Sequence, residues 1–173
     1  ALLRPLPYAD ADRLVMIGGG SGASDPTNAS FMSEINRQIE GLGLSPFVEQ
    51  TGYVDDKAVG AYLAACDMVA LPFADGASYR RGSLMAAIHY GCAICTTMPR
   101  VPIPAFRDGE NMLMVQAEDT PALAKGIRRL YESPELRERL KKGASALAYE
   151  FEWSEIAQAA AKFLRQVIEK GNL

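Results

Sequence analysis

The sequence predicts an α/β fold of three layers, in which helices cover both faces of a parallel sheet of about five to six strands. Short apolar runs without polar alternation recur along the chain, and most are separated by segments whose apolar residues have helical spacing. Three helical segments then follow one another and are expected to close the fold. No repeat or linker divides the 173 residues, so we expect a single domain over 1–173.

Five apolar runs are expected to be strands. They are 13–18, 47–50, 68–71, 93–96 and 112–115. Between them, helical spacing of apolar residues predicts helices over 31–41, after Asp55 and Asp56, and over 83–90. Either aspartate can cap the second of these helices. The compact strand–helix–strand unit over 68–96 implies parallel strands joined by a right-handed crossover.

Capping signals predict the closing helices. Thr120 is expected to be an N-cap that Pro121 follows at the first helical position, and Ser133 begins the next helix in the same way. A last helix is expected from Glu152. Its apolar residues are expected to be buried: Ile156, Phe163, Leu164 and Val167.

The loop between the strand at 68–71 and the helix at 83–90 has the composition of an anion site. Glycines allow a ligand to approach the backbone, and the free N–H groups at a helix start, arginines and hydroxyls would hold a phosphate or diphosphate. The residues are Gly76, Ser78, Arg80, Arg81, Gly82 and Ser83. The alternative is that both arginines are solvated and that Ser78 caps the helix. Asp75 is placed for chemistry in the same loop, but turn formation is its more common role.

Composition excludes several classes of function. A net charge of −3 and a pI near 5.3 argue against a nucleic-acid partner. The three cysteines lie in apolar runs and are expected to be reduced core residues of a cytoplasmic protein, and a redox or zinc role for Cys92 and Cys95 is disfavoured because their C-x-x-C runs into a strand. With His89 as the only histidine, no metal site is expected. No apolar run approaches the roughly 18 residues of a membrane span.

Three further candidates lie outside the central loop. Residues 18–23 fit the dinucleotide pattern G-x-G-x-x-G/A, but Pro26 and a turn-rich segment follow instead of an immediate helix, so a glycine loop beside another ligand is favoured. Tyr53 and Val54 follow a strand end and could flank a flat base, although Tyr53 could simply pack. Asn111, in the turn DGEN, could bind a ligand or only cap backbone groups.

Several separately spaced segments resemble one family. They are the strand followed by GGG, then GLGLSPFVEQTGYVDDKAVGAYLAACDMVALPFADG, the helix unit ending HYGCAICTT, the segment FRDGENMLMV and the tail ESPELRERLKKGASALAYEFEWSEIAQ. Together, from Arg13 to about Phe163, they resemble the C-terminal half of family 4 (group 1) glycosyltransferases of the GT-B fold. The resemblance implies a Rossmann-like domain that binds a nucleotide-sugar donor, while a separate N-terminal half, expected to be missing here, binds the acceptor.

The resemblance also implies roles for particular residues. The first glycine loop, Gly18, Gly19 and Gly20, would lie against the donor, and the segment at Tyr53 and Val54 would meet the base. The loop and helix start at 78–83 would hold the sugar phosphates. The family is generally metal-independent and needs no cofactor, so basic side chains and helix amides would neutralise the diphosphate of the nucleoside diphosphate sugar.

The sequence departs from the family pattern at two places. The family's pair of glutamates falls on Ser78 and Ala86, so neither carboxylate is present. The basic Arg and Lys after the first strand of this half are also missing, and the chain is expected to be a fragment that begins after that strand.

These observations favour the donor-binding domain of a glycosyltransferase that transfers a sugar from a nucleoside diphosphate to an acceptor. The catalytic residues are not assigned, and the fragment alone is expected to be inactive. Two alternatives stay open. One is a glycosyltransferase-like module that has lost catalysis and serves assembly or regulation, and the other is a sugar-nucleotide epimerase of the same fold.

Overall fold

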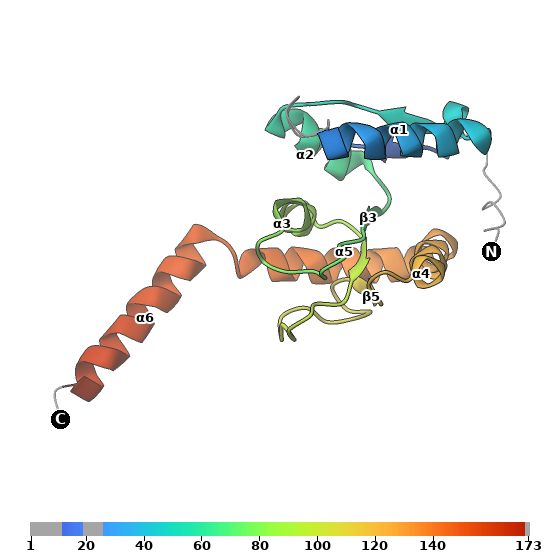
Figure 1. Ribbon diagram of the computed structural model, residues 1–173. Coiled ribbons are helices and arrows are strands. Elements are labelled where there is room, and N and C mark those ends of the chain that lie inside the picture. Colours follow the sequence, from blue (N-terminus) through green and yellow to red (C-terminus); the bar gives the residue numbers. More distant parts are fainter. Residues whose placement is uncertain (1–11, 19–25, 172–173) are drawn as a thin grey trace. The chain divides into compact units, whose positions relative to one another are not determined.

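The computed structural model describes residues 12–18 and 26–171 (Figure 1). The predicted α/β class with parallel strands is confirmed, and each of the five expected runs overlaps a strand. The chain divides into two compact units, 1–62 and 63–173. The described residues form a two-stranded ladder and a three-stranded ladder, which is a smaller number of paired strands per sheet than predicted.

The first unit is built around β1 (Leu14–Met16) and β2 (Val48–Gln50), which are parallel. Helix α1 (Pro26–Gly41) and the short 3-10 helix η1 (Ser45–Phe47) connect them. The Gln50 side-chain amide donates to Asn36 Oδ1 at 2.7 Å, which ties β2 to α1.

Helix α2 (Asp56–Ala65) begins after the β2 segment. Of the two aspartates that could cap it, the structure selects Asp55, whose Oδ1 accepts from the Ala58 amide at 2.8 Å. Its hydrophobic residue Leu63 is buried, as the helical spacing predicts.

The second unit contains a parallel sheet in the order β3-β4-β5. Its strands are β3 (Val69–Leu71), β4 (Ile94–Thr97) and β5 (Leu113–Val115). Helix α3 (Gly82–His89) is the crossover between β3 and β4, and a long loop connects β4 to β5. This parallel arrangement brings the loops that follow all three strands to one edge of the sheet.

The core of the second unit lies between the sheet and the closing helices. Helix α4 (Thr120–Glu132) packs on β4 and β5, and α5 (Pro134–Tyr149) packs on α3 and α4. The cluster comprises Ala93, Cys95, Leu113, Leu130, Leu136 and Leu140, each 6% exposed or less. At Gly126 of α4, an added Cβ would lie 3.0 Å from Cys95 Sγ, so glycine permits the close approach of this helix to the sheet.

The predicted starts of the closing helices are correct in place, but one cap differs. Thr120 is the first residue of α4 and not its cap, because the Asp119 carboxylate accepts from the Ala122 amide at 2.8 Å. A carboxylate at the N-cap also interacts favourably with the helix dipole. Ser133 caps α5 as predicted, since its Oγ accepts from Leu136 N at 3.2 Å.

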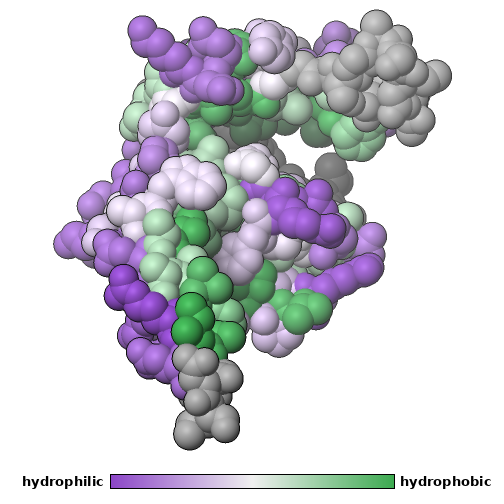
Figure 2. All heavy atoms as spheres, turned by 90° about the vertical axis from the view of Figure 1, so that its left-hand side faces the viewer, coloured by the Kyte–Doolittle hydropathy of each residue, from purple (hydrophilic) through white to green (hydrophobic). Residues whose placement is uncertain are grey.

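The predicted burial of the last helix, α6 (Trp153–Gly171), is wrong. Ile156, Phe163, Leu164 and Val167 are between 41% and 63% exposed. Figure 2 shows hydrophobic side chains gathered along this part of the chain, with hydrophilic side chains beside them. The helix itself is present as predicted, but an amphipathic pattern identifies only which face is apolar, and no described residue covers that face.

Candidate functional site

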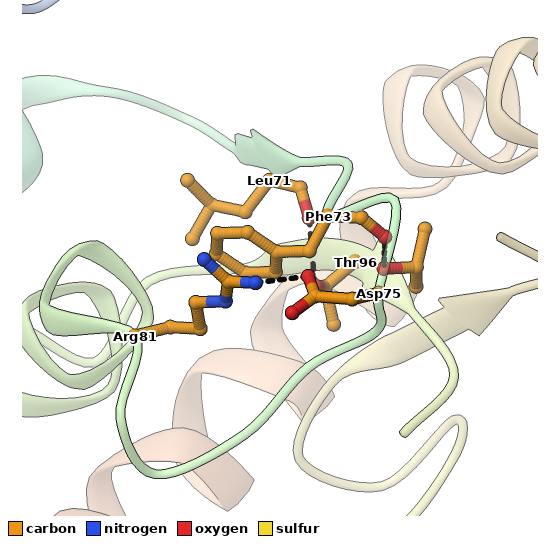
Figure 3. A network of polar contacts seen from close by, with 6 residues as sticks. Leu71, Phe73, Asp75, Arg81 and Thr96 are labelled. Carbon is orange, nitrogen blue, oxygen red and sulfur yellow. Dashed lines mark hydrogen bonds and ion pairs between the residues drawn. The ribbon is translucent and has the colours of Figure 1, made fainter. Parts of the chain in front are cut away.

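The candidate site lies at the edge of the three-stranded sheet where the strands end. Two buried threonines of β4 hold the segment that follows β3: Thr96 Oγ1 donates to the Leu71 carbonyl at 2.8 Å, and Thr97 Oγ1 donates to the Phe73 carbonyl at 2.7 Å (Figure 3). The Ala77 amide in turn donates to the Thr97 carbonyl at 3.2 Å. These bonds fix the beginning of the loop before it reaches α3.

Gly76 turns this loop against its neighbour. Its φ is +85°, a conformation that favours glycine, and an added Cβ would collide with the Met98 carbonyl and lie 3.0 Å from the Arg100 amide. The residue is buried. The sequence predicts that glycine here lets a ligand approach the backbone. A close approach at Gly76 does exist, but it is made by the backbone of residues 98–100.

The start of α3 has the features of an anion site. Arg81 occupies the N-cap position in extended conformation, and no side chain of the described part caps the helix. The first N–H groups of a helix have no partner within it, and they carry the positive end of the helix dipole. An added Cβ at Gly82 would meet nothing within 4 Å. The backbone at the helix start is thus open, and the interpretation of Ser78 as a side-chain cap is wrong.

The two arginines before α3 have different surroundings. The Arg81 guanidinium forms an ion pair with Asp75, and its Cζ lies 4.9 Å from the centre of the Phe73 ring (Figure 3). Arg80 is exposed and makes no ion pair within the described residues. One cation is therefore held across the loop, while the other extends into solvent.

Tyr79, between the candidate residues Ser78 and Arg80, anchors the loop from its other end. Its ring meets those of Phe106 and Phe151 edge-on, with centroids 5.1 and 5.4 Å apart. Burial raises the pKa of its phenol, and Glu150 raises it further. Sequence reasoning missed this residue. The feature of the sequence that could have indicated it is an aromatic residue within an otherwise polar loop.

The side chain of Asn111 forms hydrogen bonds with the backbone of its own loop. It is 1% exposed, accepts from the Arg107 amide at 2.9 Å and donates to the Ala105 carbonyl at 2.7 Å. Both polar groups of the side chain are satisfied by backbone. This geometry fits the capping interpretation, and the Asn111 side chain is buried.

The first unit carries the remaining candidates. Gly18, with φ +115°, forms an isolated bridge with Gly52, and its amide donates to Thr51 Oγ1 at 3.2 Å. Tyr53 is 89% exposed, so it does not pack, and Val54 is half-buried. Gly19 and Gly20 lie outside the described residues.

Within the described ranges, no group of three or more His, Cys, Asp or Glu side chains could hold a metal ion. His89 is exposed at the far end of α3, edge-on to Tyr90 with a centroid separation of 5.1 Å. None of the described helices combines the length and apolar character needed to cross a membrane.

Parallel strands, crossover helices and an open helix start at the carboxyl edge define a Rossmann-like α/β protein. A model of the family described as glycosyl transferases group 1 matches residues 2–133, and the chain belongs to this family.

Two curated relatives are both D-inositol 3-phosphate glycosyltransferases. That of a Nocardioides species is 30% identical over 165 residues, which cover 89% of this chain and 34% of the relative. That of Streptomyces griseus is 26% identical over 152 residues, covering 84% of this chain and 30% of the relative. The chain thus spans about a third of the length of the curated relatives that it matches.

Solved structures share the fold. HepE of Anabaena in complex with UDP superimposes with a TM-score of 0.75 at 21% identity, over 90% of this chain and 41% of that one. Sucrose-phosphate synthase of Thermosynechococcus elongatus superimposes with a TM-score of 0.69 at 22% identity, over 91% of this chain and 39% of that one. The C-terminal domain of a glycosyl transferase group 1 protein of Francisella tularensis superimposes with a TM-score of 0.63 at 19% identity, over 73% of this chain and 65% of that one.

Proposed function

We propose that this chain is the donor-binding domain of a glycosyltransferase and that the start of α3 holds the diphosphate of a nucleoside diphosphate sugar. The single observation that carries the proposal is the uncapped helix start, with open space over Gly82 and two arginines directly before it. Membership of the glycosyl transferases group 1 family supports it. HepE of Anabaena is known in complex with UDP and with UDP-glucose.

The proposed chemistry is stabilisation of the leaving group. When the sugar is transferred, negative charge develops on the departing diphosphate, and a cation or amide that binds this charge lowers the barrier. Arg80, Arg81 and the amides of Gly82 and Ser83 are the proposed donors, with the Ser78 hydroxyl beside them. No general base is assigned.

Asp75 is proposed to hold Arg81 while the site is empty and to give it up to the diphosphate when the donor binds. The ion pair and the Phe73 ring hold the guanidinium over the loop. A diphosphate carries more negative charge than one carboxylate and accepts forked hydrogen bonds from arginine, so it would compete with Asp75 for Arg81.

The other proposed donor contacts belong to the first unit. They are Gly18, Gly19 and Gly20 near the donor, and Tyr53 and Val54 near the base. The acceptor domain is proposed to lie in sequence beyond these 173 residues. The cysteines of the described part are free thiols, which favours a cytoplasmic location.

Calorimetric titration of the 173-residue chain with UDP, GDP and ADP tests the proposal. We expect one nucleotide to bind, and we expect Arg80→Ala and Arg81→Ala each to lower its affinity by roughly tenfold to a hundredfold, because a charge-assisted hydrogen bond is worth roughly 1.5–3 kcal/mol. Arg139→Ala, on the exposed side of α5, is the control and should bind normally. If the folded chain binds none of the three, or if both variants bind like the wild type, the proposal is wrong.

A second candidate is a module that has lost catalysis. Position 86, where the resemblance expects a carboxylate, is Ala86 within α3, and the only carboxylate of the loop 72–81 is Asp75, which pairs with Arg81. Activity of the longer protein decides between the two: loss of activity in Arg81→Ala supports the enzyme, and an inert parent supports the module. Conversion of a free sugar nucleotide to its epimer would instead reveal an epimerase.

A further inference from the structure

Two thiols of the second unit converge on one carbonyl oxygen. Cys66 follows α2 directly, and Cys92 lies in the turn between α3 and β4. The Cys66 Sγ lies 3.2 Å from the Leu63 carbonyl oxygen, and the Cys92 Sγ lies 3.4 Å from the same oxygen. The two residues are distant in sequence, so this pairing differs from the C-x-x-C formed by Cys92 and Cys95.

The two thiols differ in access. Cys66 is half-buried, whereas Cys92 is 3% exposed and Cys95 is fully buried. A peroxide or an alkylating reagent can therefore reach Cys66 first. This asymmetry is typical of a pair in which an accessible thiol reacts and a buried neighbour then resolves the product.

The surroundings favour a thiolate on Cys66. The pKa of Cys66 is lowered to about 7, chiefly by the neighbouring Cys92 thiol and to a smaller extent by the Lys141 ammonium of α5. Partial burial and the Asp67 carboxylate act in the opposite direction. The same contact with Cys66 raises the pKa of Cys92, and burial raises that of Cys95 to about 11. Lys141 is itself 3.7 Å from Glu138.

The pair lies away from the candidate nucleotide site. Cys66 precedes β3 and Cys92 precedes β4, so both are at the amino ends of these strands. The loops of the candidate site leave the carboxyl ends. Gly91, next to Cys92, packs on α5: an added Cβ there would collide with Ser145 Oγ and lie 3.7 Å from the Lys141 carbonyl.

We propose that Cys66 and Cys92 form an oxidation-sensitive dithiol, in which a hydroperoxide oxidises Cys66 and Cys92 then closes a disulfide. With hydrogen peroxide, the Cys66 thiolate attacks one oxygen, the O–O bond breaks, and hydroxide leaves as the sulfur becomes a sulfenic acid. The Cys92 sulfur attacks that sulfur, the S–O bond breaks, and the departing hydroxide takes the Cys92 proton as water. The thiols lose two hydrogens in total, and the peroxide is reduced to two waters.

Peptide mapping of the intact chain after peroxide treatment and alkylation tests this assignment. We expect a disulfide between Cys66 and Cys92 that dithiothreitol reverses, with Cys95 alkylated as a free thiol. Cys92→Ser should stop at a sulfenic acid on Cys66, which dimedone traps, and Cys66→Ser should form neither product. Cys95→Ala is the matched control and should still form the disulfide.

Three results would overturn the assignment: three free thiols after excess peroxide on the native chain, a disulfide that involves Cys95, or oxidation of Cys66→Ser as fast as the wild type. Because Cys92 is buried, circular dichroism must show that Cys92→Ser is folded. If it is not folded, Cys92→Ala replaces it. Dimedone labelling of Cys66 in the wild type at short times also shows whether the sulfenic acid forms on Cys66.

Discussion

Asp75 and Arg81 form an ion pair that spans the loop between β3 and α3, with the Arg81 guanidinium also over the Phe73 ring. Both side chains are partly exposed, 51% for Asp75 and 35% for Arg81. A pair of this kind contributes at most about 1 kcal/mol to stability. Its importance is positional, because it determines where one of the two cations of the candidate site lies before a ligand binds.

Asp75→Asn is expected to raise the affinity for the nucleotide that the chain binds, by roughly threefold to tenfold, which corresponds to about 0.7–1.4 kcal/mol. The substitution removes a carboxylate that repels the diphosphate and competes for Arg81. Calorimetric titration measures the affinity. The melting temperature should hardly change, since the pair is exposed. Weaker binding would show instead that Asp75 holds Arg81 in the orientation that the ligand needs.

Two glycines at helical positions should respond in opposite ways to alanine. At Gly143 of α5, an added Cβ would collide with the Glu110 carbonyl and lie 2.8 Å from Asn111 Cα, and backbone cannot easily move aside. Gly143→Ala should therefore lower the free energy of unfolding by roughly 1–3 kcal/mol. Gly82→Ala meets open space and should leave stability unchanged or slightly higher, yet weaken nucleotide binding by covering the helix start.

Urea unfolding and calorimetry on both glycine variants separate the two effects. A stable Gly143→Ala would mean that the 110–111 backbone yields at little cost. Normal nucleotide affinity in Gly82→Ala would argue against ligand approach at the start of α3.

Asn111→Ala tests whether this residue binds a ligand or only organises its loop. Two buried hydrogen bonds to backbone are lost, at Arg107 N and Ala105 O, so we expect a loss of roughly 2–3 kcal/mol in the free energy of unfolding. Asn111→Asp keeps the acceptor but not the donor and should be destabilised as well. Nucleotide affinity measured well below the melting temperature should stay within a factor of about two. A large loss of affinity in a folded variant would restore Asn111 to the binding site.

The reactivity of Cys66 should depend on pH near neutrality. Its pKa is lowered to about 7 from an ordinary value of 9.0, so the rate of alkylation by iodoacetamide in the native chain should rise with an inflection near pH 7. In urea the inflection should move toward 9.0. Because the folded pKa is depressed, the thiolate's contribution to stability is present above the unfolded pKa and is lost as pH falls through 7.

The matched variant for this prediction is Cys92→Ala. It removes the hydrogen bond that is the largest cause of the lowered pKa, so the inflection should move upward. An inflection near 9.0 in the native wild type would contradict the proposed thiolate.

Local patterns in the sequence were sufficient for the fold class and for the positions of the strands and helices, but not for the number of strands in each sheet. Apolar runs placed all five strands, capping residues placed the starts of α4 and α5, and the glycine and arginines at 80–82 placed the start of α3. Such features depend on neighbours within a few residues, through strand burial, helix periodicity and the needs of helix ends. The family membership followed from the same segments.

Tertiary structure alone decided which side chains meet. It paired Arg81 with Asp75 and left Arg80 exposed, it turned Asn111 inward to the backbone, and it brought Cys66 beside Cys92. It also left the apolar face of α6 exposed, where periodicity had predicted burial. These outcomes depend on how elements that are distant in sequence pack together. The spacing of residues along the chain does not determine which side chains are in contact after that packing.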